Sequence, residues 1–446
     1  MHPRNGNPYD GKRVAVLGLG RSGEAAARLL AACGARVTTL ESGEAAAFGA
    51  KSAALQKLGV ETIFGAAANA HNATFDLAVI SPGLDPATPL AKSVLSRGIR
   101  TIAEIELAYS LDRTPVIAIT GTNGKTTTTE LVAAMLLSAG VRTVAGGNIG
   151  KPYSEIVVEA APYDLLTLEV SSFQLERIET FRPRAAVWLN LTPDHLDRYR
   201  DMEEYRAAKL RLFDFQEHDD DAIVNAAERL PRLRARRTTF NAYAPGADFA
   251  LDGRVIRHHG EAVLDLETTR LRGLHNAENA MAALGVAHAL GYSFASVVEA
   301  LRAYQPAPHR CELVAQHDGV DFVNDSKATN LDALEKALRS ENRPVVLIAG
   351  GKDKGFAFSS LAHLVATKVR RAVLIGEMAG RIESDWQAFV PCEQAGYSLE
   401  NAVKLARRAA RPGDVVLFSP GTSSFDMFKN YAERGDQFRA LAQSLS

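Results

Sequence analysis

The sequence predicts an α/β protein of three domains. Short apolar or β-branched runs alternate with stretches rich in alanine and leucine, which is the pattern of parallel βαβ units. The 446 residues are enough for about three domains of roughly 150 residues each. Candidate boundaries at residues 110–114 and 304–309 predict domains over residues 1–110, 111–306 and 307–446.

The composition excludes several classes of function. There are 51 Lys and Arg against 52 Asp and Glu, a formal net charge of −1, so the charge gives no basis for binding nucleic acid or a membrane surface. The distant cysteines Cys33, Cys311 and Cys392 argue against a disulfide framework and a structural zinc site. The polar segment Met1–Asp10 lacks the apolar core of a signal peptide, and no apolar run is long enough to span a membrane. We expect a cytoplasmic monomer whose partners are small molecules.

The first block of the chain carries a glycine-rich turn between a strand and a helix. Strands are predicted over Arg13–Leu17, Arg36–Leu40 and Leu77–Ile80, and a helix over Gly23–Cys33. The turn Gly18-Leu19-Gly20-Arg21-Ser22-Gly23 is a full GxGxxG, and Glu41 follows about 20 residues on, at the end of the next strand. Such glycines let a diphosphate approach the backbone at a helix N-terminus. This predicts a Rossmann-like nucleotide-binding domain, and the residue types do not choose between NAD and another nucleotide.

The second block carries a stronger nucleotide signal. A strand over Pro115–Thr120 leads into Gly121-Thr122-Asn123-Gly124-Lys125-Thr126 and then a helix through Leu137. Loop amides and the Lys125 ammonium suit the β- and γ-phosphates of ATP, and the Thr126 hydroxyl suits Mg²⁺. The loop departs from GxxxxGK[ST], whose first glycine would fall at Ile119. We predict a central α/β domain of the phosphate-loop ATPase type.

Two strands of the central domain end in side chains that suit a metal site. The strand Leu165–Val170 contains Glu169, and the strand Ala185–Leu189 runs into Asn190-Leu191-Thr192-Pro193-Asp194-His195-Leu196-Asp197. Because parallel strands end at one edge of a sheet, Glu169 is expected to reach the phosphate loop and hold Mg²⁺. By the same argument, His195 is a candidate ligand of a second metal ion or of the substrate.

The rest of the chain continues the α/β pattern. Between Asp221 and Arg272, short extended pieces with turns at Asp252-Gly253 and His259-Gly260 predict a small β excursion, followed by a helix over Asn276–Leu290. Strands are predicted in the last block over Val320–Val323, Val345–Ala349, Ala372–Ile375 and Val415–Phe418. Their alternation with helices predicts a C-terminal Rossmann-like α/β domain.

Taken in order, the motifs resemble those of the ATP-dependent Mur ligases of peptidoglycan synthesis, over about residues 11–440. Besides the phosphate loop, they are Gly147-Asn148-Ile149-Gly150, Glu169–Leu175, Asp194–Asp197, Tyr205–Lys209 and His275–Asn279. Within the family, Asn324–Asn330 and Ser419–Asp426 resemble the glutamate-adding members. The departures are small: Thr122 and Thr126 stand where the family also uses Ser, and Tyr431 stands where Phe is common.

The resemblance implies a role for each motif. The first domain would hold the UDP part of the substrate rather than NAD, with Leu19, Arg21, Ser22, Glu41, Ser42, Ser81 and Gly83. From the central domain, Asn148 would also contact this nucleotide-sugar substrate or the second Mg²⁺. ATP would be bound by Gly121, Thr122, Asn123, Gly124, Lys125, Thr126, Thr127, Asn276, Asn279, Arg310 and Asp325. The acceptor amino acid would be bound by Lys327, Thr329, Lys354, Ser424, Phe425 and Tyr431. For Phe425 and Tyr431 a place in a helix core, and for Lys354 a solvated loop charge, remain alternatives.

The resemblance also implies the chemistry. The γ-phosphate of ATP would pass to the carboxylate of UDP-N-acetylmuramoyl-L-alanine, and the amine of D-glutamate would attack the acyl phosphate. The catalytic residues would be Lys125, Glu169, His195 and Lys209, and two Mg²⁺ ions would be held by Thr126, Glu169, His195 and Lys209. An ammonium would repel a metal ion, so Lys209 is implied to be a carbamate there.

Other interpretations stay open. Another ligase of the superfamily, such as folylpolyglutamate synthase or one specific for L-glutamate, is close, but the Asp-Asn-Pro-Arg motif of the diaminopimelate-adding enzyme is absent from the sequence. An NAD-dependent dehydrogenase would explain GxGxxG and leave the phosphate loop without a role. A non-catalytic nucleotide-binding regulator would not need Glu169, His195 and Lys209 together.

Overall fold

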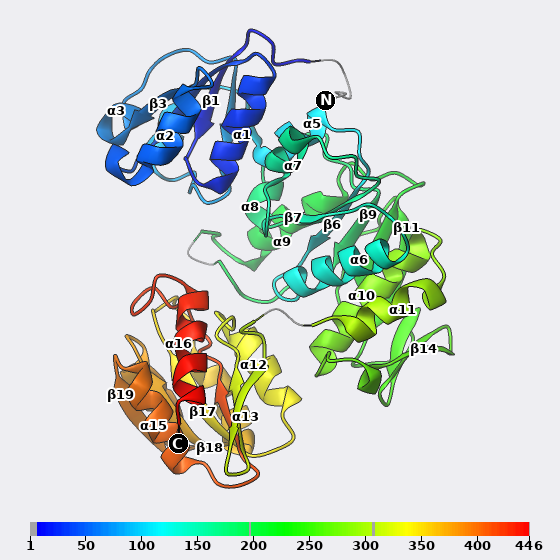
Figure 1. Ribbon diagram of the computed structural model, residues 1–446, viewed down its shortest axis with the longest axis vertical. Helices are drawn as coiled ribbons and strands as arrows, with labels where there is room; N and C mark the ends of the chain where they lie inside the picture. The colour runs from blue at the N-terminus through cyan, green and yellow to red at the C-terminus, as the bar shows by residue number, and fades with distance from the viewer. Residues whose placement is uncertain (1–6, 196–197, 306–307, 446) are drawn as a thin grey trace. The chain divides into compact units, whose positions relative to one another are not determined.

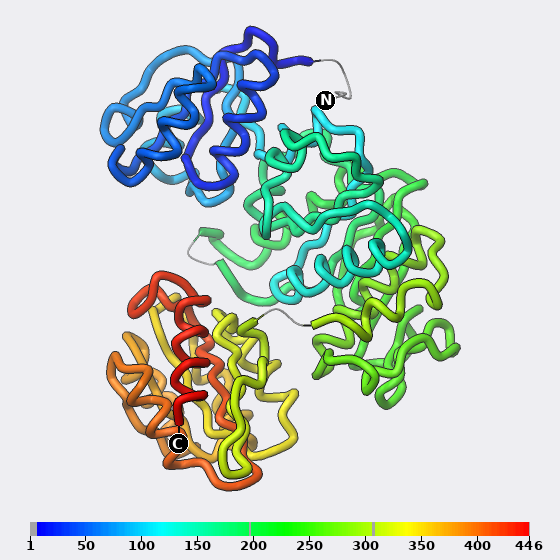
Figure 2. Tube along the Cα trace, viewed as in Figure 1, coloured from blue at the N-terminus to red at the C-terminus, as the bar shows by residue number. Residues whose placement is uncertain are grey.

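The computed structural model describes residues 7–195, 198–305 and 308–445 (Figures 1 and 2). Most of the segment Met1–Asp10, the motif residues Leu196 and Asp197, and the predicted boundary between residues 306 and 307 lie outside the described residues. The chain divides into two compact units. The first comprises Met1–Leu191, Arg198–Asp265 and Glu278–Arg302, and the second comprises Thr192–Asp197, Leu266–Ala277 and Ala303–Ser446.

The N-terminal sheet is parallel, with strand order β3-β2-β1-β4-β5. Its strands are β1 Arg13–Leu17, β2 Arg36–Glu41, β3 Glu61–Phe64, β4 Leu77–Ile80 and β5 Thr101–Ala103. Its helical segments are α1 Arg21–Ala32, η1 Ala45–Phe48, α2 Gly49–Gln56, α3 Gly65–Asn69, α4 Pro89–Leu95 and α5 Glu104–Leu111. The order reverses between β1 and β4, and ligands of such sheets bind beside the carboxyl ends of the strands at that point.

The central sheet has the order β14-β13-β12-β11-β10-β9-β6-β8-β7. Its strands are β6 Val116–Thr120, β7 Ala145–Gly147, β8 Leu166–Glu169, β9 Ala185–Trp188, β10 Asp221–Asn225, β11 Arg236–Asn241, β12 Phe249–Asp252, β13 Val255–His258 and β14 Glu261–Asp265. Its helical segments are α6 Lys125–Ser138, α7 Tyr153–Glu159, α8 Ser172–Leu175, α9 Met202–Leu210, η2 Arg211–Phe213, α10 Leu274–Ala289 and α11 Phe294–Ala303. The short segment η3 Leu266–Thr268 and the first residues of α10 belong to the second unit.

The predicted β excursion is not separate from the central sheet, because its strands extend that sheet. Strand β10 pairs parallel with β9, and β11 and β12 continue in parallel. Strand β13 pairs antiparallel with both β12 and β14, and the two hairpins turn at the predicted positions Asp252-Gly253 and His259-Gly260. The sequence therefore predicted the strands and turns here, while their pairing with β9 depends on tertiary contacts.

The C-terminal sheet belongs to the second unit and has the order β15-β16-β20-β17-β18-β19. Its strands are β15 Glu312–His317, β16 Val320–Asn324, β17 Val345–Gly350, β18 Val369–Ile375, β19 Cys392–Gly396 and β20 Val415–Phe418. Its helical segments are α12 Leu331–Ser340, η4 Phe358–Leu361, α13 Ala362–Lys368, α14 Ala379–Trp386, α15 Leu399–Ala409 and α16 Tyr431–Gln443. Alternate residues of β17 pack on opposite faces: Leu347 in the cluster with α12, α13 and α14, and Ile348 in the cluster with α15 and α16.

Helix α5 connects the N-terminal and central sheets inside the first unit, and its glutamates bind the central sheet's connections. The carboxylate of Glu104 accepts a hydrogen bond from the backbone N–H of Ser154 at 2.6 Å. Glu106 accepts hydrogen bonds from the backbone N–H groups of Glu179 and Phe181, at 2.9 and 3.0 Å. A single cluster of buried apolar side chains runs through both sheets. The two sheets of this unit are thus joined by apolar packing and by hydrogen bonds to the side chains of Glu104 and Glu106.

In the described part of the chain, no helix is both long and apolar enough to cross a membrane.

Candidate functional site

The phosphate loop lies between β6 and α6, as predicted. Gly121 and Gly124 have φ of 155° and 86°, and Gly124 precedes the first residue of α6. A Cβ on Gly124 would lie 2.3 Å from Asn279 Oδ1, so the loop needs glycine there for both conformation and space. Lys125 Nζ donates to the carbonyl oxygens of Gly121 and Thr122 at 3.0 and 2.8 Å. The loop thus folds around an ammonium at a helix N-terminus, which is the environment a phosphate prefers.

Asn190, at the end of the neighbouring strand β9, fixes the shape of this loop. Its side chain accepts from the N–H of Asn123 at 2.9 Å and donates to the carbonyl of the same residue at 3.0 Å. Its own carbonyl accepts from the N–H of Thr122 at 2.9 Å. Asn190 was not predicted to have a role, although it lies just beyond the end of a strand, close to the sheet edge where Glu169 was predicted to act.

Glu169, the last residue of β8, reaches the phosphate loop as predicted and contacts Thr126 there. The Thr126 hydroxyl donates to Glu169 Oε2 at 2.7 Å, and Asn148 Nδ2 donates to Glu169 Oε1 at 2.8 Å. Glu169 is buried at the end of β8, which pairs directly with β6. A buried carboxylate beside a hydroxyl and a phosphate loop offers the hard oxygen ligands that suit Mg²⁺. These residues therefore fit a Mg²⁺–nucleotide complex.

Lys209 also reaches the phosphate loop. It lies on α9, its exposed fraction is 1%, and its Nζ donates to the carbonyl of Gly121 at 2.8 Å. The ring of Tyr205, one helical turn before it, lies 4.8 Å from the same Nζ, and the Tyr205 hydroxyl is 3.3 Å from Thr122 Oγ1. The described residues contain no group of three or more His, Cys, Asp or Glu that could hold a metal ion. Lys209 as a metal ligand therefore stays a prediction.

His195 lies in the second unit, with Asp194 and Lys354. Asp194 Oδ1 accepts from the backbone N–H of His195 at 2.9 Å and from Lys354 Nζ at 3.1 Å. Burial acts to raise the pKa of Asp194, but the positive charges of His195 and Lys354 outweigh it, so the pKa lies below its usual value. Glu169 and Lys209 belong to the first unit. The predicted metal site shared by His195 and these two residues stays a prediction.

The residues predicted around the ATP base and ribose are divided between the units. Asn279 and Thr127 are buried in the first unit, where Asn279 Oδ1 accepts from Thr128 Oγ1 at 3.3 Å. Asn276 lies in the second unit, with Arg310 and Asp325. Asp325 accepts from the Ser419 hydroxyl at 2.8 Å, and burial raises the pKa of this carboxyl to about 6. A common adenine site formed by these residues stays a prediction.

Two residues predicted to bind the acceptor amino acid, Lys327 and Tyr431, are in contact. Lys327 Nζ lies 3.7 Å from the centre of the Tyr431 ring. Ser424 is buried and Thr329 is half-buried. The Phe425 side chain is 67% exposed, so its alternative interpretation as a helix-core residue is wrong.

The sequence analysis also missed Arg434, a buried residue of α16. Its guanidinium donates to the Ser326 carbonyl at 2.8 Å and to the Thr422 carbonyl at 3.2 Å. Burial lowers the pKa of Arg434 to about 9. The guanidinium joins the two motifs Asn324–Asn330 and Ser419–Asp426, but nothing in the sequence distinguishes it from a surface helix arginine.

The GxGxxG turn of the N-terminal sheet is tightly built. Glu41 accepts from the backbone N–H of Leu19 at 2.7 Å and of Gly43 at 2.9 Å, and the Ser81 hydroxyl donates to the Gly18 carbonyl at 3.1 Å. The remaining predicted residues of this site differ in environment: Ser42 donates to Asn69 Oδ1 at 3.0 Å, Ser22 is half-buried, and Arg21 and Gly83 are exposed. Glu41 therefore holds the turn through the backbone N–H of Leu19.

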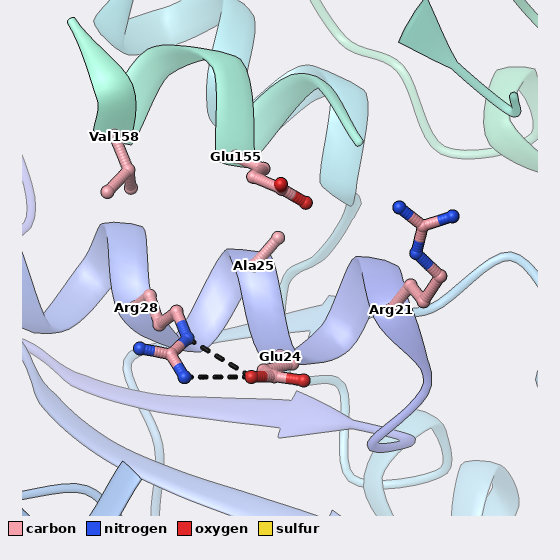
Figure 3. A pocket seen from close by; sticks show the side chains of 6 residues that line it. All are labelled: Arg21, Glu24, Ala25, Arg28, Glu155 and Val158. Atoms are coloured by element: carbon pink, nitrogen blue, oxygen red, sulfur yellow. Dashed lines mark hydrogen bonds and ion pairs between the residues drawn. The ribbon is translucent and has the colours of Figure 1, made fainter. Parts of the chain in front are cut away.

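Arg21 also lines a cavity between α1 and α7. The cavity has a volume of about 300 Å³, and Figure 3 shows its lining residues Arg21, Glu24, Ala25, Arg28, Glu155 and Val158. The carboxylate of Glu24 pairs with Arg28 at 2.8 Å on the same helix. Arg21 is thus the first residue of α1, and it belongs both to the GxGxxG turn and to the lining of this cavity.

The fold and the site define a phosphate-loop α/β protein built to hold a nucleoside triphosphate beside a second nucleotide-type domain. Family models match three regions: "Mur ligase MurD-like, N-terminal domain" at residues 12–103, "Mur ligase middle domain" at 119–287 and "Mur ligase, glutamate ligase domain" at 309–421. The chain belongs to the Mur ligase family.

Similar proteins extend over the whole chain. It is 43% identical to the UDP-N-acetylmuramoylalanine--D-glutamate ligase of Salinibacter ruber, covering 97% of this chain and 98% of the relative. It is 42% identical to the protein of the same name from Geobacter metallireducens, covering 98% of both. The fold is similar to the solved UDP-N-acetylmuramate-alanine ligase MurC of Thermotoga maritima, with a TM-score of 0.63 and 20% identity over 97% of this chain and 99% of that one. The fold is also similar to that of MurF from Acinetobacter baumannii, with a TM-score of 0.61 and 18% identity over 96% of this chain and 93% of that one.

Proposed function

We propose that this protein joins D-glutamate to UDP-N-acetylmuramoyl-L-alanine at the expense of ATP, as a ligase of peptidoglycan precursor synthesis. The relatives that carry this name match at 41–43% identity over nearly the full length of the chain. The observation that carries the proposal is the contact of Thr126 with Glu169 beside Lys125 in a Mur ligase chain. We propose that the protein acts as a cytoplasmic monomer.

The phosphoryl step would be supported by the loop and its neighbours. Lys125 releases its two loop carbonyls to meet the β- and γ-phosphate oxygens, while Thr126 and Glu169 are the residues that would hold Mg²⁺. Bound Mg²⁺ would neutralise charge on the phosphate oxygens as they approach the substrate carboxylate. Asn148 keeps Glu169 oriented through its hydrogen bond to Oε1. Lys125, together with the Mg²⁺ that Thr126 and Glu169 would hold, would thus reduce the repulsion between the two anions.

Amide formation then takes two chemical steps. A carboxylate oxygen of UDP-N-acetylmuramoyl-L-alanine attacks the γ-phosphorus, and ADP leaves, which gives an acyl phosphate. The amine of glutamate attacks the acyl carbon, loses a proton, and phosphate leaves as the amide forms. Effective positioning of the two reactants supplies much of the rate in reactions of this kind.

The remaining predicted residues would bind the three substrates. The UDP part would lie at the GxGxxG turn, with Glu41 holding the turn in shape. The two carboxylates of glutamate would be met by Lys354 and by the pair of Lys327 and Tyr431. Asn276, Asn279, Arg310 and Asp325 would face the base and ribose of ATP. His195 would contact the nucleotide-sugar substrate or a second Mg²⁺.

We propose further that Lys209 acts as a carbamate. A buried lysine amine loses its charge readily, and the neutral amine can add carbon dioxide to give an anion with two oxygens. Those oxygens would serve a second Mg²⁺ beside the loop. The position of Lys209 Nζ, 2.8 Å from the Gly121 carbonyl, supports a role at the phosphates.

Phosphate release tests this function. The purified chain is mixed with ATP, UDP-N-acetylmuramoyl-L-alanine and, one at a time, D- and L-amino acids. We expect release only when all three substrates are present, with D-glutamate the preferred acceptor. Preference for L-glutamate or another amino acid would assign a different ligase of the superfamily. No release with any acceptor, together with saturable binding of NADH, would support the dehydrogenase instead.

A further inference from the structure

Arg198 is a nearly buried arginine of the first unit that the sequence analysis did not single out. Its side chain is 12% exposed. One nitrogen of the guanidinium, Nη1, donates to the carbonyl oxygens of Pro82 and Leu84 at 3.2 and 3.3 Å. The other, Nη2, donates to Glu176 Oε2 at 2.8 Å. Arg198 therefore joins the loop after β4 of the N-terminal sheet to the segment after α8 of the central sheet.

The central side of this connection is itself well fixed. The guanidinium lies 4.0 Å above the ring of Phe173, and the Tyr199 hydroxyl donates to the other oxygen of Glu176 at 2.7 Å. Phe173 and Glu176 lie in and directly after α8, a few residues beyond Glu169 at the end of β8. Ser171 and Gln174 form a capping box at the start of α8. The guanidinium is thus held by a carboxylate and a ring face close in sequence to the proposed Mg²⁺ ligand.

The N-terminal side of the connection is the loop Ser81–Leu84. The Ser81 hydroxyl donates to the carbonyl of Gly18, the first glycine of the GxGxxG turn. The same loop contributes Ser81 and Gly83 to the proposed UDP site. A displacement of the Pro82 and Leu84 carbonyls would therefore move Ser81 and Gly83 and, through the Ser81 hydroxyl, disturb the GxGxxG turn at Gly18.

We infer that Arg198 is a positioning residue for the nucleotide-sugar substrate. It holds the loop Ser81–Leu84 in the conformation that binds the UDP part. It also fixes the position of that loop relative to the central domain, where ATP is proposed to bind. This inference rests on the proposed function. The planar fork of the guanidinium is essential, because it reaches two carbonyls and a carboxylate at once. A lysine at this position has one compact charge and would keep only part of these contacts.

Arg198→Ala and Arg198→Lys test the inference in the full chain. We expect KM for UDP-N-acetylmuramoyl-L-alanine to rise roughly tenfold in the alanine variant and less in the lysine variant, because charge-assisted hydrogen bonds to the loop are lost. KM for ATP and for D-glutamate should change less than about twofold. Calorimetry with the UDP substrate in the absence of ATP should show the same loss of affinity.

Arg182→Ala is the matched control. Arg182 also makes two charge-assisted contacts in the central domain, with Asp219 and Asp220 at 2.5 and 2.6 Å, and its exposed fraction is 35%. We expect this variant to lose thermal stability without a selective change in KM for the UDP substrate. The comparison separates the loss of an arginine ion pair from the loss of the loop contact.

The results distinguish failure of the inference from failure of the proposed function. A folded Arg198→Ala variant with unchanged KM for the UDP substrate, or KM values that rise equally for all three substrates in both variants, would overturn the positioning role. If the alanine variant does not fold, the lysine variant and its calorimetry decide. A wild-type protein that releases no phosphate with these substrates would overturn the proposed function itself, before any variant is compared.

Discussion

Lys209 is buried against the phosphate loop, where its Nζ donates to the carbonyl of Gly121. We predict that Lys209→Ala loses most of its activity and that acetate at millimolar concentration restores part of it. The reason is that acetate would supply carboxylate oxygens where the carbamate is proposed. The measurement is the rate of phosphate release with and without acetate, with chloride at equal ionic strength as the control.

Two results would contradict this account of Lys209. Wild-type rates in the variant would make the lysine a helix residue without a catalytic role. If the variant folds but is inactive, and neither acetate nor formate restores its activity, the lysine is needed for the reaction but the carbamate proposal is contradicted.

Lys354 pairs with Asp194 at 3.1 Å, and its side chain is 22% exposed. We predict that Lys354→Ala raises KM for glutamate on the order of 30-fold and KM for ATP little, since the loss of an ammonium–carboxylate pair in a closed site costs about 2 kcal/mol. Steady-state kinetics with each substrate varied in turn measures this. Lys352→Ala, which removes an exposed lysine of the same loop, is the control. Equal KM values for glutamate in the Lys354→Ala and Lys352→Ala variants would contradict the assignment of Lys354 to the glutamate site.

Glu104 is a carboxyl group whose pKa burial raises from 4.5 to about 7. Between these two values the folded chain keeps a proton that the unfolded chain has released, so the free energy of unfolding falls as pH rises through this window. Glu104→Gln has no such proton and is expected to be more stable than wild type at pH 8, by up to about 3 kcal/mol. Chemical denaturation of both proteins from pH 5 to pH 8 measures the difference. A difference that does not change with pH would contradict the prediction.

Helix α6 has a left-handed glycine at each end, and this offers a test of the loop as an element. Gly124 has φ of 86° at its start and Gly140 has φ of 80° beyond its end. A Cβ would collide with Asn279 at the first position and meets no atom within 4 Å at the second. We predict that Gly124→Ala raises KM for ATP at least tenfold, while Gly140→Ala costs about 1 kcal/mol of stability and leaves KM unchanged. Melting curves and ATP-dependent rates of the two variants check this.

The elements differ in how well the sequence could predict them. The strands Leu77–Ile80 and Val415–Phe418 have the predicted bounds, because each is a fully buried apolar run. Helix α1 begins at Arg21 rather than Gly23, since it starts directly after the second glycine of the turn. Strands such as Thr101–Ala103 and Ala145–Gly147 were missed because three residues carry no periodic signal.

The same limit applies to the site. The meeting of Thr126 and Glu169 could be predicted because strand ends in a parallel sheet share one edge. The contacts of Tyr205 and Arg198 could not, since they depend on which loop a helix or turn packs against. The GxGxxG pattern predicts a ribose-binding carboxylate at Glu41, and it does not predict the hydrogen bond that Glu41 accepts from the backbone N–H of Leu19.

At the scale of the whole molecule, the two proposed nucleotide sites stand on different sheets, on the GxGxxG turn after β1 and on the phosphate loop after β6. We predict that Lys125→Ala abolishes turnover and leaves the Kd for UDP-N-acetylmuramoyl-L-alanine within about twofold of wild type. Calorimetry with each nucleotide separately measures this. Equal losses of affinity for ATP and for the UDP substrate would contradict two independent sites.

The composition of the second unit limits how this protein can be cut into pieces. That unit takes Thr192–Asp197 and Leu266–Ala277 from the middle of the chain as well as everything from Ala303 onward. A gene fragment that begins at codon 303 would therefore encode a truncated body, without the carboxylate of Asp194 that Lys354 Nζ contacts at 3.1 Å. Recombination between relatives at that codon would pair a Lys354 loop from one parent with an Asp194 from the other. Exchange of this unit as a cassette requires the three stretches to be transferred together.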